Sequence, residues 1–383
     1  MTEIQRGEVL DLVTGDHHAL VEQRAIRAEP RFETHDAGVF EQAQELDVVD
    51  VPVSVHVGPS KRDIDVVRGL SHGAIIAAAD MVTSVTIPEN RALVDPLEDL
   101  LDVLDLQPAG PDVFIGRSQP MPHGRVFGGQ VLAQSVIAAG RTVNDLADAA
   151  EHPRRIHSLH GYFLRAGDSS APIRFVVERL RDGHSFSARG VHAIQNDQPI
   201  LSVMTSFQTH AAGMDHQDSM PAAPDPETLQ TLAEVFSGID NAQATFWSED
   251  KAIDLRHVEG AIYVRPGRQQ AAQQGVWLRA VGHIPDDPLV HAAVLAYSSD
   301  YSLLEPVLRR HGLAWSDRRL RAASLDHAMW FHRPGRADEW TLYTQASPSA
   351  SGGRGLAAGR MFNMDGILLA TVAQEGMLRV KQS

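Results

Sequence analysis

One acidic residue lies on the apolar face of a predicted helix in the C-terminal half of the chain. The apolar positions after Asp287-Pro288 recur at helical spacing and predict one helix from Leu289 to Arg310, and Asp300 falls on its apolar face. A carboxylate there costs free energy unless it is paired, hydrogen-bonded or used in a reaction. Asp300 is therefore a candidate general base. The alternatives are that it caps a kink at Ser298-Ser299 or pairs with an arginine.

The chain contains no cysteine, so any catalytic group must be built on oxygen or nitrogen. This excludes a disulfide framework, a thiolate zinc site and a cysteine nucleophile. His157 and His160, and likewise His327 and His332, have an odd spacing on predicted strands, which directs the two members of each pair to opposite faces. The same argument rejects a dyad of Asp326 and His327. We expect no metal site.

Two polar residues at strand ends are weaker candidates by themselves. Ser324 begins the strand SLDHAMWFHR but lacks the G-x-S-x-G elbow of a serine nucleophile in α/β-hydrolases. Gln374 lies near the end of the last long strand, where its amide could donate to an oxyanion or orient a water. Both positions are equally typical of ordinary turn and strand-end residues.

A glycine pair and two arginines are candidates for binding a phosphate-bearing substrate. Gly128 and Gly129 precede a predicted helix, whose N-terminus can bind an anion. Arg125, just before them, and Arg354, in SGGRG, could contact a polyphosphate. Packing glycines and surface arginines would produce the same pattern.

The elements that must position these residues occur twice. Residues 93–210 form a first domain, in which a helix of small residues precedes antiparallel strands separated by turn pairs such as Asn196-Asp197. Residues 211–250 have the Pro- and Asp-rich composition of a linker, and residues 251–383 repeat the plan. The stretch YFLRAG is echoed by WFHRPG, which indicates an internal duplication of an α+β unit.

The net charge and the distribution of apolar residues limit the possible binding partners and the cellular location of the protein. The net charge of −15 argues against a nucleic acid or an anionic membrane as the main partner. No signal peptide and no uninterrupted apolar run of membrane-spanning length is visible, so we expect a cytoplasmic protein. Residues 1–92 lack sustained periodicity. They are either a loosely folded extension or the product of an upstream start, with natural initiation near Met81.

Several blocks of sequence together resemble the type II acyl-CoA thioesterases, the double-hotdog family. The blocks occur in the family's order across residues 95–383: RVFGGQVLAQ, HSLHGYFLRAGD, RLRDGHSFSAR, DDPLVHAAVLAYSSD, SLDHAMWFHRP and ATVAQEGMLR. The resemblance implies a catalytic Asp, Thr or Ser, and Gln, which correspond to Asp300, Ser324 and Gln374. Gly335 departs from the bulkier residue usual after the HRP turn. The implied fold is two fused domains, each an antiparallel sheet wrapped around a helix.

The resemblance also implies the substrate and the reaction. Acyl-CoA would be hydrolysed by a water that Asp300 deprotonates, with Ser324 and Gln374 holding the water and stabilising the oxyanion, and with no cofactor. The catalytic site would lie in the second domain. One alternative is a non-catalytic acyl-CoA sensor, and another is a hotdog enoyl-CoA hydratase, although the required histidine after Asp300 is missing. Because such sheets usually associate, we expect a homo-oligomer.

Overall fold

The computed structural model describes residues 95–381 of the 383-residue chain. The predicted N-terminal extension, residues 1–92, lies outside the described residues. The first half contains helices α2 (Pro96–Leu104) and α3 (Gly128–Asn144) and strands β1 (Gln107–Gly110), β2 (Val113–Gly116), β3 (Arg154–Phe163), β4 (Ile173–Asp182), β5 (Phe186–Gln195) and β6 (Gln198–Thr209). Asn196 and Asp197 both have positive φ, as a two-residue hairpin turn requires.

The second half repeats this order after a connecting segment. The connection carries the short helical elements η2 (Pro226–Thr228), α4 (Leu232–Val235) and α5 (Ala242–Ser248). Strands β7 (Ile253–His257) and β8 (Gln273–Ala280) follow, then helices α6 (Pro288–Ser299) and α7 (Glu305–Arg310). The last strands are β9 (Leu320–Ser324), β10 (Asp326–Phe331), β11 (Thr341–Ser351), β12 (Arg354–Asn363) and β13 (Leu368–Val380).

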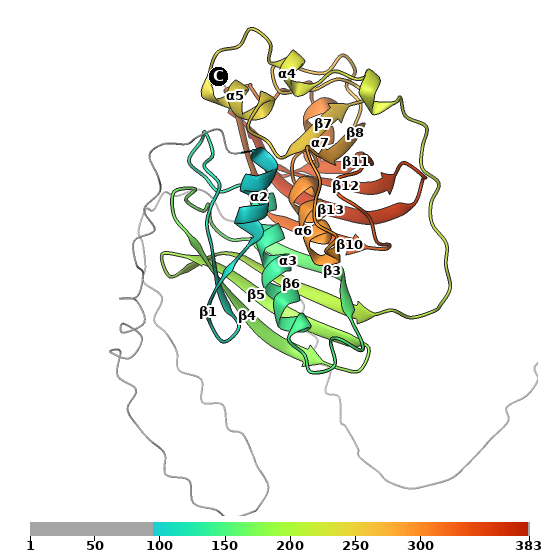
Figure 1. Ribbon diagram of the computed structural model, residues 1–383. Helices are drawn as coiled ribbons and strands as arrows, with labels where there is room; N and C mark the ends of the chain where they lie inside the picture. The colour runs from blue at the N-terminus through green and yellow to red at the C-terminus, as the bar shows by residue number, and fades with distance from the viewer. Residues whose placement is uncertain (1–94, 382–383) are drawn as a thin grey trace, which may run out of the picture. The chain divides into compact units, whose positions relative to one another are not determined.

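The strands of both halves join in one antiparallel sheet (Figure 1). From the junction outwards, the first half has the order β3-β6-β5-β4-β2 and the second half the order β10-β13-β12-β11-β8. At the junction, β3 of the first half pairs with β10 of the second half. The last strand of each half, β6 or β13, lies next to the junction strand of its own half. This matched order agrees with the internal duplication inferred from the sequence, and the α+β double-hotdog architecture is confirmed.

Helices α3 and α6 pack against each other and against the sheet (Figure 1). Almost every residue of α3 from Gly129 to Val143 is buried, which its small side chains permit. Gly140 lies directly against the side chain of Leu289 and leaves no room for a Cβ atom. This close approach brings the N-terminal end of each helix near the C-terminal end of the other.

The single helix predicted from Leu289 to Arg310 is wrong, because the structure contains two helices. Helix α6 ends at Ser299, and α7 begins at Glu305 after a turn. Pro306 has no backbone N–H to donate, and its ring would crowd the carbonyl one turn earlier, so a continuous helix is disfavoured there. Asp300 consequently caps the end of α6 and does not lie on the face of a longer helix.

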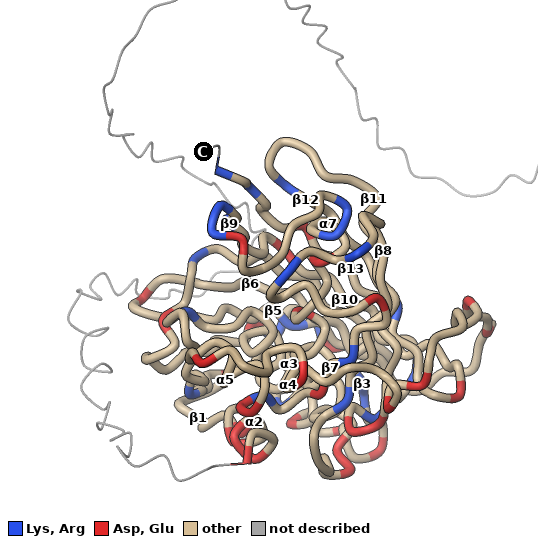
Figure 2. Tube along the Cα trace, turned by 90° about the horizontal axis from the view of Figure 1, so that it is seen from above, with Lys and Arg blue, Asp and Glu red and all other residues tan. Residues whose placement is uncertain are grey.

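Within residues 95–381, no helix combines the length and apolar composition needed to cross a bilayer. The charges are unevenly distributed along the fold. Figure 2 shows arginine and lysine residues around α7, β9 and the C-terminal end of the chain, and Asp and Glu residues around α2.

Candidate active site

Asp300 lies where the ends of two helices meet. It is the C-cap residue of α6, with φ −88° and ψ −6°. The first turn of α3 comes so close that a Cβ atom on Gly128 would lie 2.6 Å from Oδ2 of Asp300. The preceding residues Tyr297 to Ser299 are buried, whereas Asp300 keeps partial access to solvent. A water molecule can therefore reach a carboxylate that is otherwise surrounded by protein.

The other two predicted residues point at the same carboxylate oxygen. Nε2 of Gln374, on β13, donates to Oδ1 of Asp300 at 2.7 Å. The hydroxyl of Ser324, the last residue of β9, lies 3.5 Å from that oxygen, which is long for a hydrogen bond. Ser324 pairs with Gly376 across β9 and β13, so both side chains come from neighbouring strands of one sheet. The structure thus brings Asp300, Ser324 and Gln374 together.

The first half supplies part of this site, which sequence reasoning missed. The backbone amide of Gly129 hydrogen-bonds to Asp300 and favours its charged form. A Cβ atom on Gly129 would collide with the carbonyl of Tyr297, so only glycine permits the approach. Gly128 and Gly129 thus contact the carboxylate itself. Their predicted role in binding a substrate phosphate stays a prediction.

The surroundings of Asp300 raise its pKa from 3.8 to about 6. Burial is the main cause, and the hydrogen bonds from Gln374, Gly129 and Ser324 oppose it. The C-terminal end of α6 carries partial negative charge, whereas the N-terminal end of α3 carries partial positive charge. Tyr301 and Tyr343 are titratable neighbours that interact with Asp300, and burial raises the pKa of both, so they stay neutral. Asp300 is consequently poised to exchange a proton near neutral pH.

His327 extends the network behind Gln374. Its ring is buried, and Nε2 lies 2.9 Å from the hydroxyl of Ser299. Asp326 faces away, and its carboxylate accepts from the backbone amide of Glu375 at 2.8 Å. This opposite orientation agrees with the rejection of an Asp326–His327 dyad. The sequence shows only that His327 comes one residue after the start of a strand. The groups that surround its ring are seen only in the structure.

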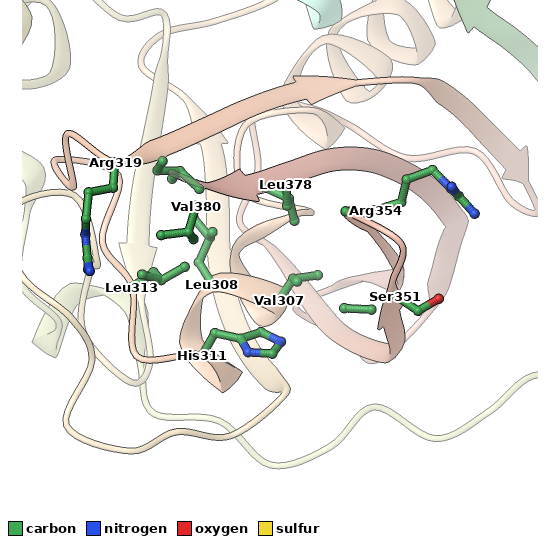
Figure 3. A pocket seen from close by; sticks show the side chains of 12 residues that line it. Val307, Leu308, His311, Leu313, Arg319, Ser351, Arg354, Leu378 and Val380 are labelled. Atoms are coloured by element: carbon green, nitrogen blue, oxygen red, sulfur yellow. The ribbon is translucent and has the colours of Figure 1, made fainter. Parts of the chain in front are cut away.

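Neither of the two predicted arginines forms an ion pair or hydrogen bond with Asp300. Arg125 is exposed at the entrance to α3 and takes part in no ion pair within residues 95–381. Arg354 forms an ion pair with Glu375, with 3.0 Å between Nε and Oε1. It also lines a cavity of about 460 Å³, where Figure 3 shows Arg354 and Arg319 at opposite ends of an apolar lining. None of Asp300, Ser324 and Gln374 lines that cavity.

No cluster of three or more His, Asp or Glu side chains suited to a metal ion occurs in the described part of the chain. The groups that converge on Asp300 are instead a carboxylate of raised pKa, an amide, a hydroxyl and a backbone N–H. Such a set can deprotonate a water and donate hydrogen bonds to developing negative charge. It lacks a thiol nucleophile, because the chain has no cysteine.

Comparison with known proteins places this arrangement in a family. A family model described as acyl-CoA thioesterase N-terminal domain matches residues 117–208, and one described as acyl-CoA thioesterase matches residues 249–377. Human acyl-coenzyme A thioesterase 8 is 40% identical over 304 residues, which cover 75% of this chain and 92% of that protein. Acyl-CoA thioesterase 2 of Haemophilus influenzae is 36% identical over 299 residues, covering 75% and 99% respectively.

A solved structure supports the same relationship. The acyl-CoA thioesterase II TesB2 of Mycobacterium marinum aligns with a TM-score of 0.59 and 40% identity, covering 74% of this chain and 98% of that one. The two family-model matches extend over both halves, and the second includes the segments that carry Asp300, Ser324 and Gln374. The chain therefore belongs to the acyl-CoA thioesterase family.

Proposed function

We propose that Asp300 is the general base for hydrolysis of acyl-CoA thioesters, the reaction of this enzyme family. One observation carries the proposal: a partly solvent-accessible carboxylate with a pKa of about 6 accepts a 2.7 Å hydrogen bond from Gln374. A general base works best when its pKa lies near the working pH. A carboxylate with the ordinary pKa of 3.8 would be a much weaker acceptor for the proton of water.

The proposed steps balance without a covalent enzyme intermediate. A water oxygen attacks the thioester carbonyl while one of the water protons passes to Asp300. Gln374 and Ser324 hold the water, and the Ser324 hydroxyl and a backbone N–H donate to the tetrahedral oxyanion. The carbon–sulfur bond then breaks, and the departing thiolate of CoA takes the proton from Asp300. Because a thiolate leaves readily, little further acid assistance is needed.

The CoA part of the substrate requires cations in a protein whose net charge is −15. We assign Arg354 and Arg125 to its phosphates, with the first turn of α3 at Gly128 and Gly129 near the reacting end. Arginine suits this task because its planar guanidinium can donate two hydrogen bonds to a phosphate. The arginine-rich end around α7 and β9 supports the assignment of Arg354 (Figure 2). A homo-oligomer and a cytoplasmic location remain part of the proposal.

The test is release of free CoA thiol from acyl-CoAs of different chain length by the full chain and by Asp300→Asn. General-base catalysis contributes about 10²- to 10⁴-fold, so the variant should lose at least about a hundredfold in kcat. Full activity of Asp300→Asn would refute the assignment. Tight binding of acyl-CoA by the wild type without turnover would instead favour an acyl-CoA sensor.

A further inference from the structure

His327 has no role in the proposed reaction, yet it is one of the most buried polar residues near the site. Its ring is only 1% exposed, and the side chain of Gln374 is equally buried. The two residues lie on the adjacent antiparallel strands β10 and β13, where Ala328 pairs with Ala373. Continuing this register by one step brings His327 beside Gln374. Both side chains are buried, and Gln374 influences the pKa of His327, so the two lie on the same face of the sheet.

The polar atoms of this pair match each other. Nδ1 of His327 and Oε1 of Gln374 are both buried, and neither has a hydrogen-bond partner within residues 95–381. Unpaired buried polar atoms are costly, so two complementary ones in contact are expected to bond. Burial lowers the pKa of His327 to about 4, and the neighbouring side chain of Gln374 is the opposing influence. The ring is therefore neutral at physiological pH and carries one N–H.

The direction of each hydrogen bond follows from the ionised carboxylate. Oδ1 of Asp300 can only accept, so Gln374 must present its Nε2 to Asp300 and its Oε1 to the ring. The oxygen needs a donor, which requires the hydrogen of His327 to be on Nδ1. Nε2 of the ring then accepts the hydrogen of the Ser299 hydroxyl, 2.9 Å away, which must turn from the carbonyl oxygen of Ala296, 2.8 Å from the same hydroxyl, to supply it. In the other tautomer, lone pairs of Nδ1 and Oε1 would face each other.

We propose that His327 is a positioning residue: its neutral ring donates from Nδ1 to Oε1 of Gln374 and thereby aims Nε2 of Gln374 at Asp300. The inference rests on the proposed role of Asp300 and names the group that orients its amide partner. With the Ser299 hydroxyl on the other side of the ring, the proposed bond completes a chain of polar groups from α6 through the sheet and back to Asp300 at the end of α6. Without this donor, the amide can rotate and place its oxygen against the carboxylate.

The kinetic test uses two substitutions at one position. His327→Leu fills a similar volume without a donor, whereas Asn in His327→Asn can supply an N–H close to the position of Nδ1. We expect His327→Leu to lower kcat about ten- to hundredfold with KM changed less than about threefold, and His327→Asn to recover most of the loss. The acid limb of the kcat profile should move to higher pH in His327→Leu, because the bond from Gln374 lowers the pKa of Asp300. His332→Leu, at an exposed histidine just after β10, is the matched control and should leave kcat unchanged.

A double-mutant cycle separates positioning from structural support. If His327 acts through Gln374, adding His327→Leu to Gln374→Ala should cause little further loss of kcat. Equal losses in both backgrounds, with an unshifted pH profile, would overturn the proposal. Nitrogen NMR of the wild type gives an answer even if the variants fold poorly. The proposal expects the ring hydrogen of His327 on Nδ1, and a hydrogen on Nε2 would overturn the proposal. Full activity of Asp300→Asn would instead refute the proposed function and leave the tautomer result standing.

Discussion

Replacing Asp300 with asparagine should stabilise the fold while it removes the activity. The pKa of Asp300 is raised from 3.8 to about 6 by folding. The folded protein therefore prefers the protonated carboxyl, and ionisation costs stability. This penalty is absent below about pH 4, grows between about pH 4 and pH 6, and is complete above about pH 7. Asparagine has a similar shape and never ionises, so Asp300→Asn escapes the penalty.

The size of the effect follows from the shift. Two pKa units correspond to about 3 kcal/mol, since each unit is about 1.4 kcal/mol. Partial solvent access to Asp300 screens the charge, and the asparagine amide cannot accept from Gly129 as the carboxylate does. We therefore expect a gain of roughly 1 to 3 kcal/mol at pH 8. For a protein of this size, that gain corresponds to a Tm increase of about 1 to 5 °C.

The assay is urea unfolding of wild type and Asp300→Asn at pH 5 and pH 8, alongside kcat at both pH values. The stability difference should be clearly larger at pH 8 than at pH 5, with an unchanged m-value. The wild-type rate should fall as the pH drops below about 6, because the base becomes protonated. A stability difference that is the same at both pH values would refute the raised pKa. A fully active variant would refute the role as base.

Three further outcomes are expected. Gly128→Ala should lower kcat at least about tenfold, because its Cβ would lie 2.6 Å from Oδ2 of Asp300 and displace the carboxylate; unchanged kcat would show that the approach is not required. Arg354→Ala should raise KM for acyl-CoA and reduce its dependence on salt while kcat stays constant, whereas an unchanged KM would exclude Arg354 from phosphate binding. His257→Leu should destabilise the protein by about 1–3 kcal/mol in denaturant unfolding, because it removes the 3.1 Å hydrogen bond between His257 and the fully buried carboxylate of Glu305. Unaltered stability would show that Gln274 and Trp315 suffice to hold that carboxylate.

Local patterns in the sequence determined much of the fold. The small residues of α3 predicted a helix packed on all sides, and alternating strands with turns such as Asn196-Asp197 predicted the antiparallel sheet. Repetition of the plan predicted two similar halves, and the strand orders on either side of the junction agree. The cost of a carboxylate among apolar residues singled out Asp300 before its partners were known.

The contacts that make the site were decided by tertiary structure. Where the helix ends depends on Pro306 and on the turn between α6 and α7, so the pattern of apolar residues predicted one helix in place of two. Sequence spacing cannot show that α3 of the first half reaches Asp300, since that contact joins residues more than 150 positions apart. Likewise, the pKa of Asp300 depends on burial, and the partner of His327 depends on strand register. These are properties of the assembled sheet and helices, and no segment of the chain contains them alone.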